Sequence, residues 1–146
     1  MMETEKKSVT LTIAWLILLI MGLLMTLGGL ESMVFAYRGS DDPIMGVSFQ
    51  TLAQLNPDLP KAIRGRRATA AFFATSCGLL VAWVAATAFR KHQKWAWYAL
   101  LCSLGVGAVL SILRVPLFDY RPGAASAGVI LIALVLALGI SYRDFK

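Results

Sequence analysis

A single carboxylate interrupts a long apolar stretch near the N-terminus. Glu31 follows an apolar run and is itself followed by Met33, Val34 and Phe35. A charged carboxylate in such a setting is costly unless it is paired or neutral, and it is a candidate for ligand binding or proton transfer by default. Arg38, a short distance further along, is the first candidate partner.

Further polar residues could join Glu31 if the chain returns to the same side of a membrane. The predicted polar cluster consists of Glu31, Arg38, Arg114, Asp119, Tyr120 and Arg121. Arginine and tyrosine side chains can bind a phosphate or carboxylate group, so the cluster could hold a lipid headgroup or a substrate. Two alternatives stay open: interfacial ion pairs with snorkelling side chains, and a proton-coupled carboxylate in a transport path.

Other reactive residue types are few. His92 is the only histidine, which excludes bis-histidine haem ligation within the chain and a His-rich metal site. Cys77 and Cys102 form no C-x-x-C motif, and their depths, measured from the basic turn 90–94 between them, differ by about 7–8 Å. A disulfide is therefore not expected, and both are predicted to be buried free thiols. Phosphate-loop, serine-hydrolase and zinc-protease motifs are absent. We expect no metal, no cofactor and no catalytic residue, and a non-enzyme rather than an enzyme.

The composition indicates which kind of fold positions these residues. Of the 146 residues 58% are hydrophobic and 15% charged, with a mean hydropathy of +0.70. Soluble domains are about 45–50% apolar and about 25% charged, so a water-soluble enzyme is excluded, and so is a disordered chain. Four runs are long and apolar enough to cross a bilayer as helices. They lie at about residues 10–35, 68–89, 95–113 and 124–142.

These runs predict an all-α, polytopic integral membrane protein, a single four-helix transmembrane domain over residues 1–146. The first run far exceeds a signal-peptide core of roughly 7–15 residues and is expected to be retained. Four spans place both termini on one membrane side, here called the termini side. Seven of the 14 Lys and Arg residues fall on each side. The three cations of the turn 90–94 lead us to expect cytoplasmic termini.

The charge and the aromatic residues fit membrane interfaces. A net charge of +6 without a long basic run favours contact with anionic lipid headgroups, not with nucleic acid. An aromatic belt is predicted on the termini side, where amphipathic rings favour the headgroup level. Its members are Trp15, Trp95, Trp97, Tyr98 and Tyr142. Trp83 lies deeper and is predicted to pack against another helix.

The first loop, residues 38–67, is long enough to hold structure of its own. Ser48 is a predicted N-cap for a short interfacial helix through Leu55, which Asn56 and Pro57 end. Asp58 is predicted to cap the next helix, which runs on into the second span.

Small residues recur at every fourth position in two spans, which lets helix backbones approach closely in lipid. The predicted helix-packing residues are Ala70, Ala74, Gly78, Ala82 and Ala86 in the second span, and Ala99, Ser103, Gly107 and Ser111 in the third. We expect the two spans to be antiparallel neighbours, although one stripe could instead face another chain.

The function expected from these features is that of a non-enzymatic structural or accessory membrane protein. It would pack in a larger membrane complex or a homo-oligomer, with membrane lipids as its other partners. Two alternatives remain: a small transporter or binder of a lipid-like ligand that uses Glu31 and Arg114, and a membrane-embedded enzyme acting on a lipid.

Overall fold

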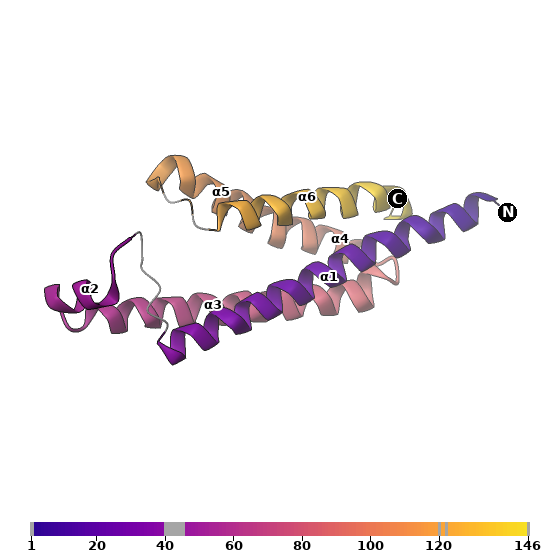
Figure 1. The fold of residues 1–146 in the computed structure, drawn as a ribbon. Coiled ribbons are helices and arrows are strands. Elements are labelled where there is room, and N and C mark those ends of the chain that lie inside the picture. The colour runs from indigo at the N-terminus through magenta and orange to yellow at the C-terminus, as the bar shows by residue number, and fades with distance from the viewer. Residues whose placement is uncertain (1, 40–45, 120, 122, 146) are drawn as a thin grey trace. The chain divides into compact units, whose positions relative to one another are not determined.

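The computed structural model describes residues 2–39, 46–119, 121 and 123–145, with side chains from residue 9 onward, and this part of the chain consists of helices joined by short turns. Figure 1 shows the helices in chain order. The α-helices are α1 (Met2–Arg38), α2 (Phe49–Leu55), α3 (Leu59–Val84), α4 (Lys94–Leu100), α5 (Val106–Phe118) and α6 (Ala124–Ser141). Two π-helical segments, η1 (Ala85–Phe89) and η2 (Leu101–Gly105), and a 3-10 turn, η3 (Tyr142–Phe145), complete the fold.

Four continuous helical stretches have the length and hydropathy of membrane spans. They are Val9–Arg38, Leu59–Phe89, Lys94–Phe118 and Ala124–Phe145. The predicted all-α class with four membrane-length helices is confirmed, and the chain is a multi-pass membrane protein. The second stretch begins earlier than its apolar core, because the basic segment that precedes the core is already helical.

The two π-helical segments were not predicted. Each widens one turn of a membrane-length helix. In η1 the Arg90 N–H donates to Ala85 O (3.3 Å), five residues back. A π turn holds more residues than an α turn and shifts which residues share a face. In η1, Ala85 and Phe89 are buried whereas Ala86 is exposed.

Contacts divide the chain into two compact units. The loop unit, Leu23–Leu79, holds the second half of α1, the helix α2 and most of α3. The terminal unit, Met1–Gly22 with Leu80–Lys146, holds the start of α1 and everything from the end of α3 onward.

The loop unit is built on a close helix crossing at Gly29. A Cβ placed there would lie 2.7 Å from the backbone nitrogen of Thr75 and 3.0 Å from the carbonyl oxygen of Ala71, and would also meet the Thr75 hydroxyl. Only a glycine permits this approach between α1 and α3. The Thr75 hydroxyl donates to Ala71 O (2.9 Å), which satisfies it within its own helix.

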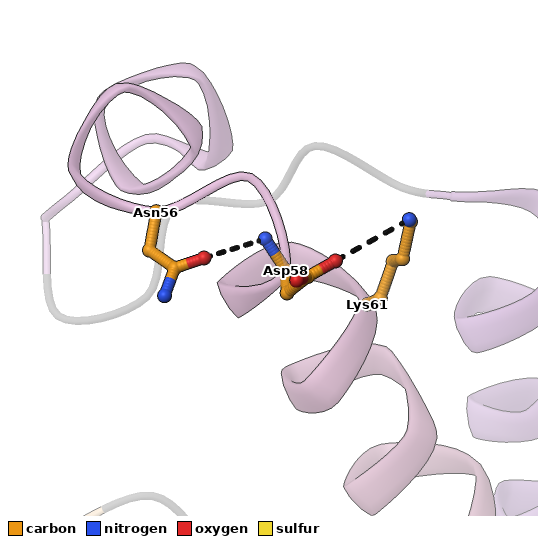
Figure 2. A network of polar contacts seen from close by, with 3 residues as sticks. All are labelled: Asn56, Asp58 and Lys61. Carbon is orange, nitrogen blue, oxygen red and sulfur yellow. Dashed lines mark hydrogen bonds and ion pairs between the residues drawn. The ribbon is translucent and has the colours of Figure 1, made fainter.

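Helix α2 is bounded as the sequence predicts. The Ser48 hydroxyl accepts from the Thr51 N–H (3.1 Å), and the helix ends at Leu55 with Asn56 as its C-cap. The turn to α3 is held by Asn56 Oδ1, which accepts from the Asp58 N–H (2.9 Å), and the Asp58 carboxylate is 3.4 Å from the Lys61 ammonium (Figure 2). Helix α3 then begins at Leu59, directly after Asp58.

In the terminal unit, α5 and α6 run side by side (Figure 1). Among the described residues of the reversal between them, Asp119 (φ 48°) and Gly123 (φ 80°) are left-handed. The largest side chains that are fully buried in this unit are Leu18, Phe89, Leu134 and Ser141. The Ser141 hydroxyl donates to Ala137 O (2.7 Å), so it is satisfied without a partner from another helix.

Candidate functional site

The residues of the predicted polar cluster belong to different units. Glu31 and Arg38 lie exposed on α1 within the loop unit. Arg114, Asp119 and Arg121 lie in the terminal unit, and Tyr120 is outside the described residues. A binding cluster formed by all six therefore stays a prediction.

The described contacts of Arg114 lie within the terminal unit. This side chain is half-buried, and its Nε donates to Ser111 O (3.4 Å). Its guanidinium lies beside the turn at Gly123, 3.6 Å from the place that a Cβ would occupy. Arg114 thus lies against the reversal between α5 and α6, while Asp119, which ends α5, and Arg121 are exposed.

The small-residue stripe of the second span is partly covered. Gly78 and Ala82 are buried and Ala74 is half-buried, whereas Ala70 and Ala86, at its two ends, are exposed.

The corresponding stripe of the third span lies on the surface of the chain. Ala99, Ser103 and Gly107 are exposed, Ser111 is half-buried, and no atom of another segment lies within 4 Å of a Cβ placed at Gly107. The same helix buries a different face, made of Ala96, Leu100, Leu104 and Ala108. Within the described chain, the small residues at 99, 103 and 107 are therefore open to a neighbour from outside.

Two predictions of burial in the spans are wrong. Cys102 is exposed on the third span, and Cys77 is half-buried. Trp83, predicted to pack against another helix, is 71% exposed. A thiol or an indole on a membrane helix can face lipid tails without the penalty of facing water, so hydrophobicity alone does not indicate which side it takes. Among the described residues, no three His, Cys, Asp or Glu side chains gather as metal ligands would.

Three rings of the predicted aromatic belt, Trp97, Tyr98 and Tyr142, line a hollow in the terminal unit. The hollow has a volume of about 180 Å³ and is lined by Lys94, Trp97, Tyr98, Tyr142 and Phe145. Lys94 begins the third membrane-length helix, and Tyr142 and Phe145 belong to the last turn of the fourth. Sequence reasoning placed three of these rings at one membrane interface but missed Phe145 and the hollow, because residue type and spacing do not show where rings converge.

The walls of this hollow are fixed by contacts around Trp97. The indole N–H donates to Leu138 O (3.2 Å). The Trp97 ring is 5.2 Å from the Tyr98 ring, edge to face, and 6.1 Å from the Tyr142 ring. The indole is thus held in one orientation between two helices.

The C-terminal turn, which contributes Tyr142 and Phe145 to the lining of the hollow, also contacts other parts of the terminal unit. The Phe145 ring is buried 4.8 Å from the ring of Phe89. The Asp144 carboxylate accepts from the Thr10 hydroxyl of α1 (3.1 Å). Nearby in the chain, the Arg90 guanidinium lies 5.3 Å from the ring of Trp15, a cation–π contact.

Two arginines of the first loop are engaged inside the loop unit. The Arg64 guanidinium lies over the ring of Phe49 (5.2 Å) and against the backbone of Gly39. Arg67 lies over the ring of Phe35 (5.6 Å), and its Nε donates to the Ser32 hydroxyl (3.4 Å). These side chains connect α1, α2 and α3.

No family model matches the chain, and neither a curated protein nor a solved structure shows significant similarity to it. Its function is therefore argued from its own residues.

Proposed function

We propose that the protein is a non-enzymatic structural or accessory membrane protein that packs against another membrane chain through the third membrane-length helix. The observation that carries this proposal is the exposed face of Ala99, Ser103 and Gly107. Small residues at helical spacing allow two backbones to approach closely in lipid, where van der Waals packing replaces the hydrophobic effect as the driving force. A helix that contacts only lipid gains no packing energy from carrying glycine or alanine in place of a larger residue.

The native cysteine next to this face supplies a direct test. Cys102 precedes Ser103 and is exposed, so oxidation in native membranes should join two copies, or join one copy to a partner that offers a thiol, if the face is an interface. A Cys77→Ser variant should crosslink as well as the wild type, and a Cys102→Ser variant should not.

A matched pair of glycines then tests whether the face itself matters. Gly107→Leu should abolish the crosslink, because the new side chain separates the two helices. Gly139→Leu is the control: this glycine is also exposed, lies in α6 and has open space at its Cβ. Equal crosslinking in both variants would refute the proposal.

We also propose that both termini face the cytoplasm. The support is the turn that carries Arg90, Lys91 and Lys94, all exposed, between two membrane-length helices. A membrane-impermeant thiol reagent applied to intact cells should fail to label Lys91→Cys in a Cys77→Ser/Cys102→Ser background. It should label this variant once the cells are opened.

A further inference from the structure

The hollow lined by Lys94, Trp97, Tyr98, Tyr142 and Phe145 lies within the terminal unit. It is formed by the ends of two membrane-length helices, and its lining contains one cation, two phenols, an indole and a phenyl ring. We propose that it binds the phosphate-containing headgroup of an anionic phospholipid. This inference is independent of the proposed packing through the third helix.

The charge of the side chains that line the hollow favours an anionic ligand. Lys94 contributes an ammonium group, and the described residues that line the hollow include no carboxylate. The acid of the C-terminal turn, Asp144, accepts instead from the Thr10 hydroxyl. An aromatic cage around a cation would be a second possibility for these rings, but the Lys94 charge would repel a quaternary ammonium group. An ammonium has three N–H donors, so Lys94 can keep a contact within the chain and still donate to a phosphate oxygen.

The position of the hollow at the ends of membrane-length helices favours a lipid over a soluble anion as the ligand. Helix ends of membrane-spanning length lie at the headgroup level, and tryptophan and tyrosine are enriched there because one end of each ring system is apolar and the other polar. The exposed phenol of Tyr98 offers a hydroxyl to a polar headgroup, and the exposed ring of Tyr142 lines the same hollow. The neighbouring apolar surface of the helices can accept an acyl chain.

The size and rigidity of the hollow fit a small headgroup. A volume of about 180 Å³ corresponds to roughly six water molecules at about 30 Å³ each, which is enough for a phosphate and a glycerol-sized group. The walls exist before any ligand arrives, because the Trp97 indole is held by Leu138 O and Phe145 by its contact with Phe89. A preformed site loses less entropy on binding than one that must be ordered.

The test uses the purified full-length protein in mild detergent, titrated separately with phosphatidylglycerol, phosphatidylcholine and inorganic phosphate. Native mass spectrometry measures the bound fraction, and thermal unfolding measures stabilisation. We expect the wild type to bind phosphatidylglycerol at least about tenfold more tightly than phosphatidylcholine. Lys94→Gln should weaken phosphatidylglycerol binding by about tenfold, the order expected for losing one charge-assisted hydrogen bond.

The matched control is Lys91→Gln. Lys91 belongs to the same basic turn, is exposed and does not line the hollow, so the substitution removes the same charge and should leave binding within twofold of the wild type. Tyr98→Phe removes only a hydroxyl from an exposed ring and should weaken binding severalfold without affecting folding.

Three outcomes would overturn the inference. The first is an equal loss in the Lys91 and Lys94 variants, which would indicate general surface charge. The second is equal affinity of the wild type for the two lipids. The third is displacement of the lipid by millimolar phosphate, which would identify a soluble anion as the ligand.

Discussion

The two adjacent glycines of α1 are expected to respond in opposite ways to the same substitution. A Cβ at Gly28 would meet nothing within 4 Å, whereas a Cβ at Gly29 would lie 2.7 Å from Thr75 N and 3.0 Å from Ala71 O. Thr75 N and Ala71 O are backbone atoms, so neither can move without moving α3. Gly28→Ala should therefore stabilise the protein and Gly29→Ala should destabilise it.

The expected difference in stability between the two variants follows from two free-energy contributions. Replacing a helix-interior glycine by alanine stabilises by about 0.5–1 kcal/mol when space allows, through the conformational entropy of the unfolded chain. This gain is common to both variants and cancels in their difference. Forcing a methyl group into a packed contact costs about 1–3 kcal/mol. Gly29→Ala should thus be about 1–3 kcal/mol less stable than Gly28→Ala.

The assay is reversible unfolding in mixed micelles with increasing dodecyl sulfate, followed by tryptophan fluorescence and circular dichroism. Adding Thr75→Ala to Gly29→Ala removes the hydroxyl that the new methyl meets but leaves the backbone nitrogen, so it should rescue only part of the loss. Equal stability of the two alanine variants, or a full rescue by Thr75→Ala, would refute the close crossing of α1 and α3.

Three further predictions concern single side chains. Arg64→Met should speed amide hydrogen exchange in α2, because the Arg64 guanidinium lies over the ring of Phe49, the first residue of that helix. Arg66→Met, a change at an exposed neighbour, should leave the exchange rate unchanged. Equal exchange rates in the two variants would contradict the contact between Arg64 and Phe49. Phe145→Ala should lower the free energy of unfolding by about 3 kcal/mol, because the buried ring packs against another phenyl ring, and a loss under 1 kcal/mol would argue against that packing. Lys61→Gln should leave the unfolding midpoint unchanged, because its pair with Asp58 is exposed on both sides and screened by water, so a clear shift would contradict this view of the turn in Figure 2.

Features set by local rules could be predicted from the sequence. Hydropathy and length predicted four spans, and four membrane-length helices are present. The bounds of α2 followed from the Ser48 cap and from Asn56 and Pro57, because capping and proline geometry act within a few residues. The free state of both cysteines also agrees with the prediction.

Features that depend on which helix face meets which neighbour could not be predicted. In water, burial selects the apolar face, but in lipid both faces of a span are apolar, so the exposure of Trp83 and Cys102 has no sequence signal. The π turns η1 and η2, which shift the register of two spans, were not predicted from the sequence. For the hollow, the sequence predicted an aromatic belt near Lys94 but not the contacts of Trp97 that shape it.

We propose that the exposed face of Ala99, Ser103 and Gly107 contacts another membrane chain. Native mass spectrometry of the protein, gently extracted from its own membrane without overexpression, tests this most directly, because it reports the stoichiometry and the partner chains together. We predict a homo-oligomer or a heteromeric assembly that Gly107→Leu converts to a monomer and Gly139→Leu leaves intact. A wild-type monomer, or an assembly that Gly107→Leu does not affect, would contradict the claim.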